Sequence, residues 1–177
     1  MRNMWAGPIN TDPRGLSQAG LTIASFTTAP TVGVFPDLNL APNFFTRGRQ
    51  LRMHAKGIWA ATGTPTYTFS IKVGSITVVT SAAITVSALT NQAWELDVDL
   101  RVDTEGSSGT LLGQGHVDLG GVTGTQYLPA TGTAPAPSGS QDLGAQLTLR
   151  LEIACSVSSA SNTCKGFLSR FEAWDFA

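Results

Sequence analysis

The stretch Trp94-Glu95-Leu96-Asp97-Val98-Asp99-Leu100-Arg101-Val102-Asp103 decides the fold, because its even positions are all apolar and its odd positions are all charged. A period of two predicts a β-strand with one face in a core and the other in water. A helix would spread the same charges around every side. The glycine and serine residues of 106–109 predict a turn that ends this strand and reverses the chain.

The same alternation recurs along most of the chain after Gly48. We expect strands at 51–59, 67–73, 76–86 with a break at 81–83, 94–103, 110–119, 147–155 and 167–176. No segment keeps the helical period of 3.6 for three turns, and the glycines and prolines of 120–139 predict one long loop. This pattern predicts an all-β protein, an antiparallel β-sandwich. We expect a jelly roll, with an immunoglobulin-like sandwich as the alternative.

Residues 1–45 differ from the rest because prolines and glycines interrupt them at short intervals. Only 21–26 reads as a short strand in this region. We interpret 1–45 as an extended N-terminal arm that packs against the domain or a neighbour, and 46–177 as the β-sandwich domain. A wandering loop with one added edge strand is the alternative interpretation of the arm.

Composition limits the classes of partner. The 177 residues suffice for one domain with a core, and charged residues make up 13% of them, about half the usual share. A net charge of −1 provides no basic field for nucleic acid, and no run of apolar residues is long enough to span a membrane. The N-terminus lacks the apolar core of a signal peptide, so we expect synthesis in a cytosol. Low charge is typical of surfaces that neighbours cover.

Catalytic and metal-binding motifs are weak. His54 and His116 lack the spacing of a zinc site, no Gly-x-Ser-x-Gly elbow presents a nucleophile, and the glycines at 113–121 do not open a helix. We therefore expect no catalytic residue, no metal and no cofactor.

Four carboxylates lie on one face of the central strand, about 7 Å apart at successive odd positions. They are Glu95, Asp97, Asp99 and Asp103. We interpret this face as a solvated or subunit-facing sheet surface, with calcium binding or a glycosidase pair as alternatives.

Cys155 and Cys164 flank residues 156–163, which read as a hairpin loop. In a regular hairpin, the residue numbers of directly opposed residues always add up to the same total. A Cys155–Cys164 pair needs an odd total, whereas the apolar pairing of Ile153 with Phe167 needs an even one. A disulfide would therefore need a bulge, and two free thiols are the alternative in a cytosolic product.

Aromatic residues at the C-terminus and in the arm are candidate contact anchors, because exposed aromatic rings are costly unless a partner covers them. A place in the core is the alternative for each. Two arginines are added to these aromatic residues, one in the arm and one just before the first expected strand of the domain. The interface candidates are Trp5, Arg14, Phe35, Phe44, Phe45, Arg47, Trp174 and Phe176.

Three short motifs occur in order along the chain. They are Leu38-x-Leu40-Ala41-Pro42-Asn43-Phe44-Phe45-Thr46-Arg47-Gly48-Arg49, Thr90-Asn91-x-x-Trp94-x-Leu96 and Gly106-x-x-Gly109-Thr110-x-x-Gly113-x-Gly115. With the long loop and closing strands that follow, residues 30–176 resemble a family of small virion proteins of tailed bacteriophages and their prophages.

The resemblance implies a jelly-roll or related β-sandwich, often trimeric, that decorates or cements capsids or forms part of fibres. It supplies no catalytic residue. Asn91 would cap a turn, Trp94 would start the core face, and the glycines would form a hairpin.

Our hypothesis is a capsid decoration (cement) protein on the virion surface, a homotrimer that binds across subunits of the major capsid protein. The alternative is a head- or tail-fibre module that presents the 120–139 loop to host surface glycans, where Tyr127 is the one aromatic candidate. An enzyme of the glycosidase or lyase type is the third hypothesis.

Overall fold

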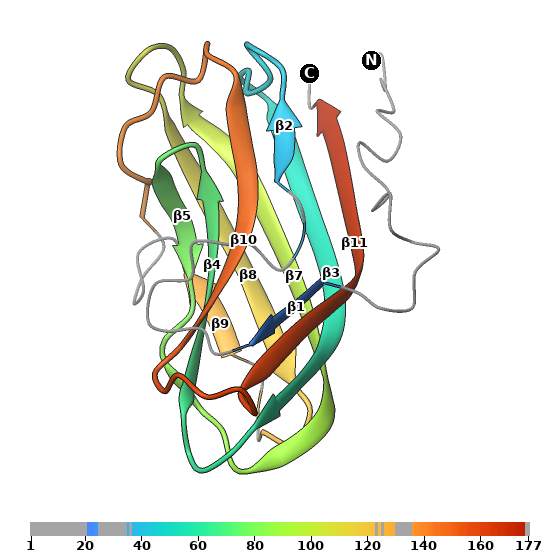
Figure 1. Ribbon diagram of the computed structural model, residues 1–177. Helices are drawn as coiled ribbons and strands as arrows, with labels where there is room; N and C mark the ends of the chain where they lie inside the picture. Colours follow the sequence, from blue (N-terminus) through green and yellow to red (C-terminus); the bar gives the residue numbers. More distant parts are fainter. Residues whose placement is uncertain are drawn as a thin grey trace.

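The computed structural model describes residues 21–24, 35, 37–122, 124, 126–129 and 136–175. Its strands form two antiparallel sheets that stack as two layers (Figure 1). The six-stranded sheet contains, in spatial order, β1 (Leu21–Ala24), β11 (Thr163–Asp175), β3 (Arg49–Ala61), β7 (Leu89–Thr104), β8 (Thr110–Leu119) and β9 (Gln126–Pro129). The five-stranded sheet contains β2 (Leu38–Leu40), β10 (Leu147–Cys155), β4 (Thr66–Val73) and β5 (Ile76–Thr80), with β6 (Ile84–Thr85) paired to β4. The all-β sandwich is confirmed.

The period of two decides which side of each strand is buried. In β7 the side chains of Trp94, Leu96, Val98 and Leu100 are buried, and the charged residues between them are not. Strands β3, β4 and β10 alternate in the same way. The expected break at 81–83 is also present, because β5 ends at Thr80 and β6 begins at Ile84.

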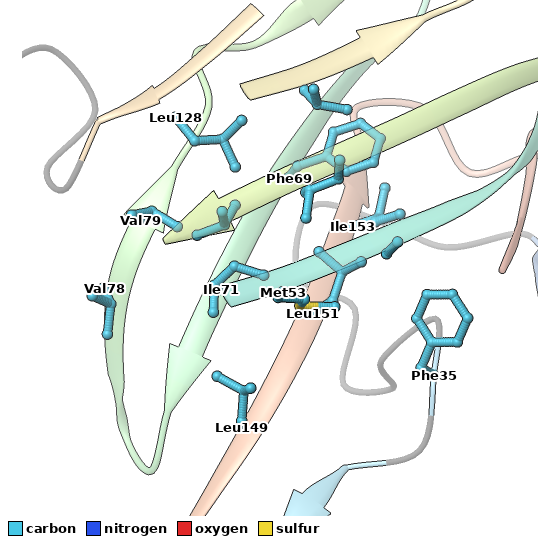
Figure 2. Packing of buried hydrophobic residues seen from close by; sticks show 14 of the residues in the cluster. Phe35, Met53, Phe69, Ile71, Val78, Val79, Leu128, Leu149, Leu151 and Ile153 are labelled. Atoms are coloured by element: carbon cyan, nitrogen blue, oxygen red, sulfur yellow. The ribbon is translucent and has the colours of Figure 1, made fainter. Parts of the chain in front are cut away.

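The core lies between the two sheets. Figure 2 shows Met53 of β3 from one sheet close to Ile71 of β4 and Leu151 of β10 from the other. All three side chains are at most 3% exposed, so the core is shielded from water by both layers. Burial of each such side chain contributes roughly 1.5–3 kcal/mol to folding.

Gly57 is the tightest point of the six-stranded sheet. It is paired with Gly166 of β11 and Trp94 of β7. A Cβ atom at Gly57 would lie 1.8 Å from the Lys165 carbonyl oxygen and 2.6 Å from the Trp94 Nε1. Because Gly57 has no side chain, the Trp94 indole can cross it and donate a hydrogen bond to that carbonyl at 3.1 Å.

Two buried serines, Ser81 and Ser138, extend the backbone hydrogen bonding of a sheet beyond the end of a strand. The Ser81 backbone N–H donates to the Phe69 carbonyl at 2.8 Å, and its Oγ accepts from the Phe69 N–H at 3.0 Å. Ser138 makes the same pair of bonds with Leu111 of β8, at 2.8 and 3.0 Å. Each hydroxyl thus replaces a backbone carbonyl and satisfies a buried donor.

Three expectations need correction or completion. The 120–139 segment is not one unbroken loop, because β9 lies within it and pairs with β8. The 156–163 segment is not a hairpin, since β10 and β11 belong to different sheets and this segment crosses between them. Within 1–45, β1 forms an edge strand on β11, and β2 with Leu38 and Leu40 joins the sandwich core.

Candidate functional site

The outer face of the six-stranded sheet carries two cross-strand rows of polar side chains. Each row follows from strand register, because residues directly opposite one another point to the same side of a sheet. The row we call the His54 row consists of Arg170, His54, Asp97, His116 and Tyr127. The adjacent Arg52 row consists of Glu172, Arg52, Asp99 and Gln114.

Ion pairs join these rows at their centre. The Arg52 guanidinium donates to both carboxylate oxygens of Asp97, with Nε–Oδ1 at 2.8 Å and Nη2–Oδ2 at 2.5 Å. His54 lies beside the same carboxylate, with Nδ1 3.7 Å from Oδ2, and its Nε2 is 3.4 Å from Glu95 Oε1. Lys56 closes the cluster at 3.0 Å from that Glu95 oxygen. Asp97 is therefore held in one orientation, with a side chain only 18% exposed.

A hollow of about 620 Å³ opens over the β3–β7–β8–β9 part of this face. We call it the Tyr127 hollow. Its lining includes polar groups of both rows and the apolar side chain of Leu112. Tyr127 is 70% exposed, which makes it the most exposed large hydrophobic side chain in the described part of the chain. An apolar wall with a few convergent polar groups is the usual form of a ligand site.

Asp99 lines the Tyr127 hollow and is partly desolvated there. Its Oδ1 is buried and has no hydrogen-bond partner among the described residues. Burial raises the pKa of this carboxyl above its usual value, although the charge of Arg52 and a hydrogen bond from Gln50 oppose that rise. Asp99 thus offers acceptor capacity that no protein donor uses.

A second hollow of about 270 Å³ lies on the other side of Arg52 and Asp97. We call it the Arg170 hollow. It is completed by His54 of β3 and by Arg170 and Glu172 of β11, which form an ion pair with each other. Arg52 and Asp97 line both hollows, so the two meet at this ion pair.

This arrangement offers the chemistry of binding. Asp97 is fully engaged by Arg52, and no buried histidine or second orphaned carboxylate stands beside Asp99 to form an acid and base pair in the described residues. His54 and His116 share one row on either side of Asp97, which the sequence did not reveal. Nevertheless, across the described ranges no group of three or more histidine, cysteine or carboxylate side chains is arranged to hold a metal ion.

The interface candidates fall into three groups. Phe35 and Phe45 are 4% and 3% exposed within this chain, and Phe35 packs edge-on against Trp94 at 6.3 Å. Both rings thus lie in the core of their own chain, which is the alternative that the sequence left open for each aromatic residue. Phe44 and Trp174 are half-buried and Arg47 is exposed. Trp5, Arg14 and Phe176 lie outside the described residues.

Phe44 and Trp174 are brought to the same end of the sandwich, where β3 begins and β11 ends. We call this end the aromatic end. Arg49 donates to Asp175 from Nε at 2.7 Å, which lowers the pKa of that carboxyl, and its guanidinium lies 5.2 Å from the centre of the Phe44 ring. Trp174 is the neighbour of Asp175, opposite Gln50 of β3.

The cysteines are two free, buried thiols, so the disulfide left open by the sequence is not formed. Cys155 is paired with Tyr67 in the five-stranded sheet and Cys164 with Trp59 in the six-stranded sheet. Burial raises the pKa of the Cys164 thiol, and a buried protonated thiol is unreactive.

The sequence pointed to part of this site. Alternation put Asp97 and Asp99 on one face, and a composition argument singled out Tyr127. The contributions of Arg52, Gln114 and Arg170 were missed, because which strands are neighbours is decided by pairing between distant segments. The alternation of β3 was a usable signal for Arg52, since it put this residue on the polar side of its strand.

No helix in the described ranges is long and apolar enough to cross a membrane. No protein-family model, curated protein or solved structure matches this chain.

Proposed function

We propose that this chain is a non-enzymatic decoration (cement) protein of a tailed-phage capsid, which binds across neighbouring subunits of the major capsid protein. The aromatic end supports the proposal. It places two interface candidates that are far apart in sequence, Phe44 and Trp174, at one end of a rigid sandwich, with exposed Arg47 close by. Half-buried aromatic residues beside arginine are typical of the anchors of protein interfaces.

Further parts of this proposal rest on the sequence and on its resemblance to small virion proteins. They are the homotrimeric state, the jelly-roll connectivity and the extended arm of residues 1–45. The observation that supports the arm is that β1, within the described residues, is the outermost strand of its sheet. A protein that binds only the assembled shell would stabilise that shell by mass action.

Co-sedimentation with emptied, expanded capsids tests the decoration proposal. We expect a trimer by light scattering and saturable binding of the wild-type chain. The double variant Phe44→Ser, Trp174→Ser should bind at least roughly thirtyfold more weakly, as expected for loss of hot-spot residues. Val157→Ser is the matched control, because Val157 is 50% exposed and precedes β11, at the opposite end from Trp174.

Two results would contradict it. Wild-type protein that stays in the supernatant would overturn the decoration function. A double variant that binds like the wild type, with an unchanged circular dichroism spectrum, would overturn the role of the aromatic end.

A fibre or receptor-binding module that contacts host surface glycans is the second candidate, and one observation favours it. Tyr127 stands 70% exposed beside a hollow lined by carboxylates, two guanidiniums and amides. Sugar rings present C–H groups to aromatic faces and hydroxyls to polar side chains, so this combination suits a carbohydrate.

A glycan array tests this candidate, with Tyr127→Ala as the variant and Val157→Ala as the control for loss of an exposed apolar side chain. We expect wild-type binding that Tyr127→Ala weakens roughly tenfold. An array without binders would retire the candidate. Shortening of a bound glycan in a mass spectrum would instead show the protein to be an enzyme.

A further inference from the structure

We propose that the ligand of the outer face is a neutral, linear oligosaccharide that lies across the strands and occupies both the Tyr127 hollow and the Arg170 hollow. This inference rests on the receptor-binding candidate and specifies the shape and charge of its ligand.

The two hollows are continuous, which indicates that the ligand is an extended chain. Both are lined by Arg52 and Asp97, so a chain that leaves one enters the other above this ion pair. The His54 row crosses from β11 through β3, β7 and β8 to β9. Four interstrand spacings of about 4.8 Å make the row about 19 Å long, which is too long for a single sugar ring. The site therefore fits an extended chain that runs perpendicular to the strands.

The pairing of charges along the two rows indicates that the ligand is neutral. Arg52 is bound by Asp97, and Arg170 is bound by Glu172. Each of these two guanidiniums thus stands beside a carboxylate. The Tyr127 hollow also carries Arg101 and Asp99, one side chain of each sign, so donors and acceptors alternate while the charge is balanced. A sugar hydroxyl both donates and accepts, so it can bind between such groups without breaking them apart. A polyanion would meet Asp97, Asp99 and Glu172, at a cost in repulsion.

The two hollows differ in the contacts that they offer. The Tyr127 hollow combines an exposed aromatic ring with Asp99, whose buried Oδ1 lacks a donor among the described residues. The Arg170 hollow offers polar side chains alone. We infer a primary subsite at Tyr127, where a ring stacks, and a secondary subsite at Arg170 that only longer chains reach.

Calorimetric titration with ladders of glucose, mannose and N-acetylglucosamine oligomers, from monosaccharide to hexasaccharide, tests this inference. For a ladder that binds, affinity should rise at least roughly tenfold between the disaccharide and the hexasaccharide. The variant Arg170→Gln, Glu172→Gln should weaken hexasaccharide binding roughly threefold to tenfold and leave disaccharide binding unchanged. Lys72→Gln, on the outer face of the other sheet, is the control.

The outcomes separate the inference from the function on which it rests. Affinity that is equal for all lengths, or a double variant that binds every length like the wild type, would overturn the two-subsite ligand while the receptor-binding candidate stands. Tighter binding of sulfated or uronic oligomers than of neutral ones would overturn the assignment of charge. An absence of binding to every ladder and to the glycan array would overturn the receptor-binding candidate itself.

Discussion

The two outer faces of the sandwich are built from the same kinds of residue and differ in how completely those residues are paired. On the five-stranded sheet, Lys72 Nζ is 2.9 Å from Glu152 Oε2, and Arg150 Nε donates to Asp37 Oδ1 at 2.7 Å. The hydroxyls of Ser70 and Thr80 bond each other at 2.9 Å on the same sheet. On the six-stranded sheet, Asp99 has an oxygen without a partner and Tyr127 a ring that is 70% exposed, as far as the described residues go.

This difference indicates which outer face can still form new hydrogen bonds with a ligand. Groups that already bind one another gain less from a ligand than a buried acceptor that has no donor. A desolvated carboxylate oxygen without a donor gains the full value of a new bond. The six-stranded sheet is therefore the face on which a polar ligand can bind with net gain.

The largest effect is expected inside the six-stranded sheet. Gly57→Ala would place a methyl group 1.8 Å from the Lys165 carbonyl oxygen, so β3, β11 and the Trp94 indole cannot all keep their positions. We expect loss of the cooperative thermal transition and of the dispersed amide spectrum. Gly106→Ala is the control: its φ of +96° is strained but no atom lies within 4 Å, so it should cost only about 1–2 kcal/mol. A folded Gly57→Ala protein with wild-type stability would contradict the close packing at this crossing.

The next largest loss of stability is expected from replacing the buried serine of either sheet. Ser81→Ala leaves the buried Phe69 N–H without an acceptor, and Ser138→Ala does the same to Leu111. Each should lower the free energy of unfolding by about 1–3 kcal/mol in urea denaturation. Ser75→Ala is an exposed control, expected to stay close to wild type. Clearly unequal losses for the two buried serines would show that the sheets do not depend on this motif equally.

Replacing one partner of a surface ion pair should affect glycan binding on one face only, with little effect on stability on either face. Arg52→Gln and Lys72→Gln each remove one partner of a half-exposed pair, so each should change the unfolding free energy by at most about 1 kcal/mol. We expect glycan binding to fall only for Arg52→Gln, because Lys72 lies on the outer face of the other sheet and lines neither hollow. Equal effects of the two variants in calorimetric titration would remove the contrast between the faces.

The smallest effect concerns pH. Because burial raises the pKa of Asp99 in the folded protein, this carboxyl favours folding most below its ordinary value of 3.8, and that contribution is lost as the pH rises through the folded value. Asp99→Asn should therefore raise the melting temperature slightly at neutral pH, and the gain should disappear in acid. A gain that persists unchanged in acid would show that Asp99 carries no such penalty.

Local patterns predicted more of the fold than of the site. Alternation located β8 and β10 at their observed bounds, and Ser81-Ala82-Ala83 marked the break between β5 and β6. By contrast, β2 and β9 span only three and four residues, which is too short for a period of two to show. The site depends on neighbours such as His54 and Asp97, whose separation in sequence no local pattern reports.

The alternation of β3 and β7 has a consequence for how the protein can vary. Substitutions at the outward positions of these strands leave the inward side chains untouched, so the binding face can be rewritten while the core stays the same. Insertion of a single residue would exchange the two faces and bury the charges. Related chains with other ligands should accordingly differ by replacements at these outward positions, with no change in strand length.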